Sequence, residues 1–152
     1  MADRARLTFA RALSQDDEDE LEPIDLSYAQ HFGLEPVMTR SSLNFYTRTG
    51  HAFVAVKEGE VTGFAFAQSI WNGTRPTVYL NRLAVTELDD AESRLALIEA
   101  VTKSAYDAAV YDLQVQLPKG DKSGISALAD KGYSEVDVVS FARVLGSRGQ
   151  QV

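Results

Sequence analysis

The sequence predicts a single mixed α/β domain in which helices cover both faces of one sheet. Three observations support this class. Apolar, β-branched runs at 51–58, 61–71 and 75–85 are separated by tight-turn signals, as in an antiparallel meander. The segment 77–105 then passes from an extended run through an acidic loop into a helical pattern, as expected for a strand that feeds a helix. With 152 residues, 45% of them hydrophobic, the chain can bury one sizeable core.

The first third of the chain predicts a strand followed by helices. Apolar and polar residues alternate over 7–13, which indicates the first strand. Ser14 is a good N-cap for a helix. The acidic residues that follow it would lie in the first turn, where the positive end of the helix dipole stabilises negative charge. Pro23 leaves two alternatives: it kinks this helix, or it opens a second helix over 24–31 that Gly33 closes.

A loop and a short helix are predicted before the meander. Residues 33–40 contain the loop, and either Thr39 or Ser41 is expected to cap a helix that runs to Arg48 and ends before Gly50. This places the first strand and the helices ahead of the three paired strands.

The meander itself is marked by its turns. The nearly continuous apolar run 51–58 is typical of a strand covered on both faces. A tight turn at 58–59 leads into 61–71, and Asn-Gly at 72–73 is a strong signal for a hairpin that returns through 75–85. These three strands should form the centre of the sheet.

The second half of the chain alternates between helices and strands. A helix is predicted over 90–108, because Ala91, Leu95, Ile98, Thr102 and Ala105 occupy positions with a period of 3.6 residues. Alternation predicts a strand over 110–117, and Ser123 or Asp121 is expected to cap a short helix closed by Gly132.

The end of the chain predicts one more strand. Residues 133–145 are expected to form a final strand, which is long enough to contain a bend. The whole chain, 1–152, therefore forms one domain, with 1–5 and 146–152 as frayed ends.

Composition excludes several functional classes. The net charge of −7 argues against a nucleic-acid partner and favours small cationic molecules. No apolar run reaches the roughly 20 residues that span a bilayer, so no membrane segment is expected. The lack of cysteine fits a reducing cytoplasm, and His31 and His51 have no metal-ligand spacing, so we expect no metal site.

The segments AFVAVKEGEVTGFAFA (52–67), YLNRLAV (79–85) and ISALADKGY (125–133), in this order, resemble the GNAT superfamily of acyl-CoA N-acyltransferases. The first segment resembles the superfamily's central hairpin. YLNRLAV (79–85) is similar to its fourth strand, which ends in L-A-V before the cofactor loop, and ISALADKGY (125–133) is similar to its late helix. The resemblance covers roughly 6–145.

The resemblance implies a largely antiparallel sheet that is splayed between its fourth and fifth strands, with acetyl-CoA in the gap. The acyl group would pass to a small-molecule or peptide amine, which could be cationic, and a homodimer is compatible with this pattern. The residues that the resemblance assigns to the cofactor are the backbone of Leu83, Ala84 and Val85 and the loop and helix start at Ser93, Arg94 and Leu95.

The sequence departs from the superfamily at the chemical positions. Where a glycine-rich, basic loop binds pyrophosphate, this chain has Asp-Ala-Glu-Ser-Arg-Leu at 90–95. Asn81 replaces a carboxylate base, and Leu128 replaces a tyrosine acid, which leaves Asn81 and Tyr133 as the catalytic candidates. Two functions are therefore open: an acetyl-CoA-dependent N-acyltransferase, or a GNAT-fold ligand-binding or interaction module that does not use CoA.

Overall fold

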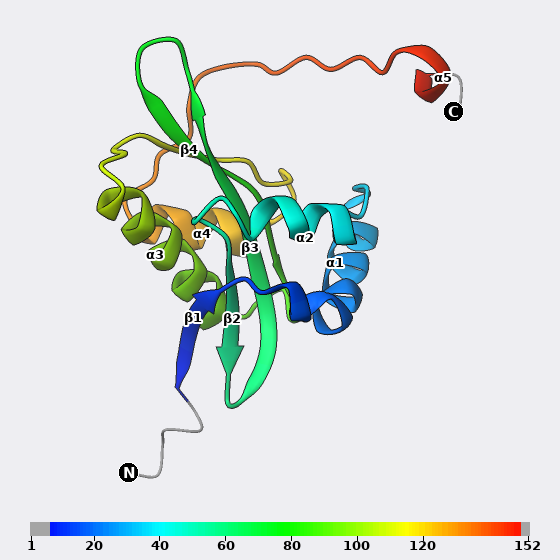
Figure 1. The fold of residues 1–152 in the computed structure, drawn as a ribbon, viewed down its shortest axis with the longest axis vertical. Coiled ribbons are helices and arrows are strands. Elements are labelled where there is room, and N and C mark those ends of the chain that lie inside the picture. The colour runs from blue at the N-terminus through cyan, green and yellow to red at the C-terminus, as the bar shows by residue number, and fades with distance from the viewer. Residues whose placement is uncertain (1–6, 150–152) are drawn as a thin grey trace.

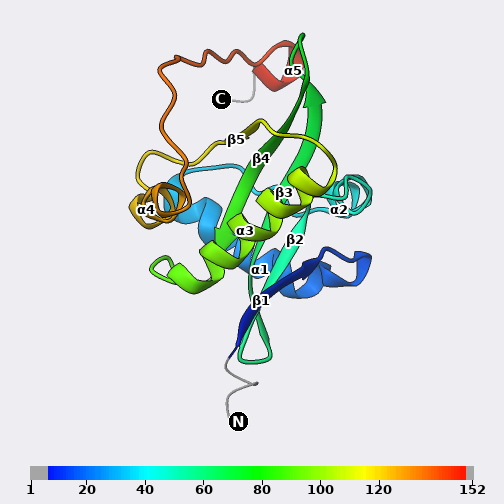
Figure 2. The same cartoon turned by 90° about the vertical axis from the view of Figure 1, so that its left-hand side faces the viewer.

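One five-stranded sheet separates two layers of helices in the computed structural model, which describes residues 7–149 (Figures 1 and 2). The strands are β1 (Thr8–Ala12), β2 (Phe53–Lys57), β3 (Glu60–Trp71), β4 (Pro76–Val85) and β5 (Leu113–Val115). The helices are α1 (Glu18–Phe32), α2 (Arg40–Tyr46), α3 (Ala91–Asp107), α4 (Lys122–Asp130) and α5 (Gly146–Gly149), with a 3₁₀ turn at Gln15–Asp17. None of these helices is long and apolar enough to cross a membrane.

The strands lie in the order in which they occur in the chain. Neighbours from β1 to β4 are antiparallel, whereas β5 runs parallel to β4. Helices α1 and α2 cover one face and α3 and α4 cover the other (Figure 1). The predicted class, a largely antiparallel mixed sheet between two helical layers, is confirmed.

Each face of the sheet has its own apolar core. The core under α3 and α4 includes Leu80, Leu83, Leu97, Ile98 and Val101. The core under α1 and α2 includes Leu21, Tyr28, Leu43, Phe64 and Phe66. Burial of these side chains supplies the main force that holds the helices to the sheet.

Local capping signals mark the start of the 3₁₀ turn that leads into α1 and the end of α1. The Ser14 side chain accepts a hydrogen bond from the Asp16 amide at 3.2 Å, and the Asp17 carboxylate accepts one from the Ser14 amide at 2.8 Å. Helix α1 continues through Pro23 to Gly33, where φ is 68°. The alternative in which Pro23 opens a second helix is therefore wrong. The predicted cap at Gly33 is confirmed, because glycine adopts this left-handed conformation without strain.

Side-chain hydrogen bonds show which of the predicted residues cap α2 and α4. The Thr39 hydroxyl, rather than that of Ser41, accepts from the Ser42 amide at 3.1 Å and caps α2. The Asp121 carboxylate accepts from the Gly124 amide at 3.1 Å and caps α4. Both residues satisfy amides that have no partner within their helix.

The predicted last strand is wrong in this structure. Residues 134–145 form no strand, and the fifth strand pairs over three residues rather than over 110–117. Figure 1 shows this segment leaving the domain and ending in α5. Alternation gives a segment the propensity for a strand, but a strand also needs a neighbouring strand to bond to. Of the predicted frayed ends, 146–149 form the turn of α5, and the rest lie outside the described residues.

Candidate ligand site

The candidate site lies next to a bulge in β4. Phe66 pairs with Arg82 and Ala67 pairs with Leu80, so Asn81 is the extra residue between them. A bulge bends a strand and increases its twist. The last hydrogen bond between the parallel strands, from the Gln116 amide to the Leu80 carbonyl at 3.1 Å, lies directly before this bend.

Beyond the bulge, β4 and the chain that follows β5 separate. A cavity of about 220 Å³ lies in the gap, lined by Tyr28, Leu34, Asn81, Arg82, Leu83, Gln116, Leu117 and Pro118. The predicted splay between the fourth and fifth strands is confirmed. The bulge gives its physical cause, because the bent part of β4 can no longer keep the spacing of a parallel pair.

One side of the gap is held by a buried ion pair. Arg82 donates to the carboxylate of Asp25 at 2.9 Å and to the carbonyl of Glu35 at 2.7 Å. Asp25 also accepts from the amides of Val37 and Met38 at 2.6 and 2.8 Å. This one carboxylate therefore connects α1, β4 and the loop that precedes α2 along the wall of the gap.

A second buried cluster joins three helices at the end of the gap. The Tyr28 hydroxyl on α1 donates to Asp121 at 2.6 Å. Two nitrogens of Arg94 on α3 contact the two oxygens of the same carboxylate at 2.9 and 2.8 Å. Burial, followed by the bond to Asp121, raises the pKa of Tyr28, so it stays a hydrogen-bond donor. Arg94, Asp121 and Tyr28 are almost entirely buried.

The N-terminal corner of α3 is capped by its own carboxylate. Asp90 accepts from the amide of Ser93 at 3.1 Å and from its hydroxyl at 2.6 Å. Lys57 contacts Asp90 at 3.1 Å and Glu92 at 3.0 Å. Burial alone would raise the pKa of Asp90, but the Ser93 donors and Lys57 outweigh it, and the net shift is downward. Asp90 is therefore a charged cap at the position where a helix dipole attracts anions.

A larger cavity, which we call the acidic cavity, lies between α1 and the loop that follows β4. It measures about 400 Å³ and is lined by Ser27, Tyr28, His31, Val85, Thr86, Glu87, Leu88 and Asp89. Glu87 and Asp89 are exposed, and neither forms an ion pair with any residue between 7 and 149. The cavity thus offers two uncompensated carboxylates beside a phenol and an imidazole.

The residues predicted to bind the cofactor are distributed around these features. Leu83 lines the gap, Val85 lines the acidic cavity, and Ala84 is buried between them in β4. Leu95 lines a groove of about 280 Å³ between α3 and α4. Ser93 and Arg94 are buried, and their side chains are already bonded to Asp90 and Asp121. Their role toward a cofactor stays a prediction.

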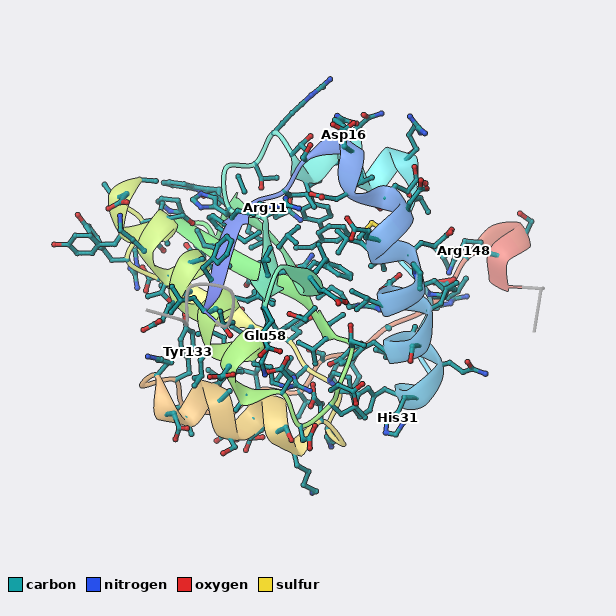
Figure 3. All side chains as sticks on the ribbon, turned by 90° about the horizontal axis from the view of Figure 1, so that it is seen from below. Arg11, Asp16, His31, Glu58, Tyr133 and Arg148 are labelled. Atoms are coloured by element: carbon teal, nitrogen blue, oxygen red, sulfur yellow. The ribbon has the colours of Figure 1, made fainter. Side chains whose placement is uncertain are left out.

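The two catalytic candidates lie on opposite faces of the sheet. The Asn81 amide nitrogen lies 3.4 Å from the Tyr46 hydroxyl, beside α2. The Tyr133 hydroxyl lies 2.7 Å from that of Thr102 on α3, and Figure 3 shows Tyr133 beside α4. Burial raises the pKa of Tyr133. The structure therefore does not bring Asn81 and Tyr133 together around one reacting atom.

Three site residues do not stand out in the sequence as members of a site. Asp25 and Tyr28 lie three residues apart on the buried side of α1, with Leu21 and Ile24, and this spacing is a usable signal. The sequence marks Asp121 only as a helix cap. Its contacts with α1 and α3 depend on tertiary packing and leave no local pattern.

Comparisons with known proteins identify the family of this chain. Residues 9–152 match a family described as "Protein of unknown function (DUF1999)". The wild-type crystal structure of TTHA1254 from Thermus thermophilus is 36% identical, covers 91% of this chain and 98% of its own, and superposes with a TM-score of 0.75. No curated protein matches the chain.

More distant solved structures have the same fold. Aminoglycoside N-acetyltransferase AAC(6')-Iy in complex with CoA is 16% identical and covers 95% of this chain and 99% of its own, with a TM-score of 0.72. The aminoglycoside acetyltransferase meta-AAC0020 from an uncultured soil metagenomic sample, in complex with sisomicin, is 18% identical and covers 91% and 97%, with a TM-score of 0.69. At these identities the likeness concerns the fold.

Proposed function

The chain belongs to the DUF1999 family of proteins of unknown function, and on this premise we propose that it binds a small cationic amine on a GNAT-like fold and does not use acetyl-CoA. The fold is that of acetyltransferases such as the two aminoglycoside enzymes. Whether a protein of this fold uses CoA depends on the residues at the site rather than on the fold itself.

The corner at the start of α3 carries this proposal. Acyl-CoA would place its pyrophosphate on the first amides of α3, but the Ser93 amide is bonded to the Asp90 carboxylate at 3.1 Å. Lys57 is paired with Asp90 and Glu92, and Arg94 is buried against Asp121. The residues present therefore do not fit a pyrophosphate, because the anion would meet carboxylates where it needs donors and cations.

The acidic cavity supports a cationic ligand. Glu87 and Asp89 have no cationic partner among the described residues, and the chain carries a net charge of −7. An ammonium group in the cavity could pair with these carboxylates, and Ser27 adds a hydroxyl group that accepts hydrogen bonds. The ligand class is thus an amine with more than one positive charge.

We expect the variant Glu87→Gln/Asp89→Asn to bind a polyamine at least about tenfold more weakly, since each exposed carboxylate contributes on the order of 1 kcal/mol at close range. Sisomicin is a suitable probe because a structural neighbour contains it. Calorimetric titration at low salt measures the change. Glu99→Gln/Asp107→Asn is the matched control, because it removes the same charge from exposed positions of α3 outside the cavity. Equal weakening in both variants would contradict a defined amine site.

Acetyl transfer from acetyl-CoA to an amine is the second candidate, and the gap between β4 and β5 favours it. Leu83, Ala84 and Val85 lie in the part of β4 that is free of β5, where their backbone would position a thioester. A titration with acetyl-CoA separates the two functions. We expect no binding heat at about 1 mM, whereas a Kd tighter than about 100 μM, or about −5.5 kcal/mol, would favour the transferase.

A further inference from the structure

The segment 134–145, which we call the C-terminal arm, is the most exposed apolar part of the structure. Its exposed hydrophobic residues are Val136, Val138, Val139, Phe141, Val144 and Leu145, and Phe141 is 92% exposed. Within the described chain, the last backbone hydrogen bond before the arm is that of the Tyr133 amide to the Leu128 carbonyl at 3.0 Å, and the arm itself forms none. Large exposed apolar patches of this kind mark interaction surfaces.

The arm has the sequence of a strand with one irregularity. Glu135 and Asp137 alternate with Val136 and Val138, and the pattern shifts by one residue at Val139 before it resumes. Such a shift is the pattern of a strand that contains a bulge or bend. The arm therefore has the sequence pattern of a β-strand, but no strand pairs with it within the described residues.

The sheet offers a complementary free edge at β5. Strand β5 is the last in the sheet, and within residues 7–149 it pairs only with β4. The carbonyl of Asp112 and the amide of Gln116 point to β4. Because successive residues of a strand direct their backbone groups to opposite sides, those of Leu113 and Val115 point outward. An open edge of this kind readily accepts another strand.

The surroundings of β5 are apolar as well. Tyr111, which lies two residues before β5, and Tyr106 are 68% and 69% exposed, with ring centroids 5.6 Å apart. An arm bonded to β5 would find apolar side chains beside it. The free edge and its surroundings thus match the arm in both hydrogen bonding and hydrophobicity.

The course of the arm leads away from the β5 of its own chain. Figures 1 and 2 show it running past the tip of the β3–β4 hairpin, apart from the sheet. Its end reaches the loop that follows α1, where Arg148 contacts Glu35 at 3.4 Å. The helix that precedes the arm, α4, lies on the opposite face.

We propose that two copies of this chain exchange their C-terminal arms, each arm adding as a strand to the free edge of β5 in the other copy. One reciprocal exchange pairs both arms with both β5 edges, and it closes under two-fold symmetry. The bonds are main-chain hydrogen bonds, while the apolar side chains of the arm cover the surface around β5. The partner is therefore a second copy of this chain.

The first experiment measures mass in solution. Light scattering on the full chain at about 5–100 μM is expected to give twice the chain mass of 16.7 kDa. Val139→Asp/Phe141→Asp should give a monomer with an unchanged circular dichroism spectrum. Leu26→Asp is the control, since Leu26 is 48% exposed on α1 and lies outside the arm. A monomeric full chain, or an equal effect of the control, would overturn the proposal.

The second experiment distinguishes exchange from addition to the chain's own sheet. The chain contains no cysteine, so a variant with Gln114→Cys in β5 and Ser140→Cys in the arm has only these two thiols. Exchange predicts that a short bis-maleimide produces covalent dimers. Crosslinks that form only within single chains would overturn the exchange, because they place each arm on its own β5.

Discussion

Replacing Arg94 with alanine is expected to lower the free energy of unfolding by about 3–5 kcal/mol, the cost typical of breaking a buried ion pair by removing one partner. The side chains of Arg94 and Asp121 are 0% and 1% exposed. Without the guanidinium, Asp121 keeps only the Tyr28 hydroxyl and the Gly124 amide as donors. The carbonyl of Leu88 also loses two donors, at 3.2 and 3.0 Å. The free energy of unfolding of a typical domain is only about 5–15 kcal/mol, so the expected loss would be a large fraction of the total stability.

Urea denaturation followed by circular dichroism measures this loss. Lys103→Ala is a matched control on the same helix, because Lys103 forms an ion pair with Asp107 in which the side chains are 77% and 57% exposed. An exposed pair of this kind contributes about 0–1 kcal/mol. If Arg94→Ala and Lys103→Ala shifted the midpoint equally, Arg94 would not be the buried link between α3 and α4 that we describe.

The same variant separates two roles for Arg94. A guanidinium that bound pyrophosphate would be accessible, and its loss would weaken acetyl-CoA binding with little change in stability. If the guanidinium instead holds Asp121, its loss lowers the stability of the protein with little change in acetyl-CoA binding. A Cβ placed on Gly124 would lie 2.8 Å from Nη1 of Arg94, so the cluster leaves no room for a residue larger than glycine at position 124. Such tight packing is typical of a structural cluster rather than of a ligand site.

The features that are predicted correctly from sequence depend on neighbours in the chain. The caps at Ser14, Gly33 and Thr39 follow from bonds between residues no more than five positions apart. The meander is predictable for the same reason, since an Asn-Gly turn fixes which two strands pair. Where a structural feature is determined within one turn or hairpin, the local residue types are sufficient to predict it.

The helix face that carries Arg94 is predicted only in part. Of the five positions in the apolar periodicity, Ile98 and Ala105 are buried and Leu95 packs against the core, whereas Ala91 is exposed and Thr102 is half-buried. The buried stripe contains Ser93, Arg94, Leu97, Ile98, Val101 and Ala105. The spacing of Arg94 to Leu97, Ile98 and Val101 is that of one helix face. The periodicity misses it because an arginine is seldom buried without a partner, and that partner, Asp121, is 27 residues away.

The bulge and the arm show where local sequence is insufficient. Nothing in YLNRLAV marks Asn81 as the residue that β3 skips, because a bulge is a relation between two strands. The same holds for 134–145, whose strand pattern contains no information about which edge it joins. Pairing between distant segments, or between chains, is determined by tertiary and quaternary contacts.

Neutralising the corner of α3 is expected to create affinity for acetyl-CoA. In the variant Asp90→Ser/Glu92→Gln, serine can still cap the helix, while Lys57 loses both of its carboxylate partners and becomes available to a phosphate. The variant removes two repulsions and makes one cation available to the phosphates, so we expect the affinity for acetyl-CoA to rise at least about tenfold.

Calorimetric titration of acetyl-CoA at low salt tests this expectation. Glu99→Gln/Asp107→Asn changes the net charge by the same amount on exposed parts of α3 away from the corner, so it reveals any general effect of charge. If this control bound acetyl-CoA as tightly as the corner variant, the corner would have no special role. If the corner variant showed no binding, the carboxylates would not be the barrier. The block would then lie in the buried contacts of Tyr28 and Arg94 with Asp121, which hold three helices together at the end of the gap.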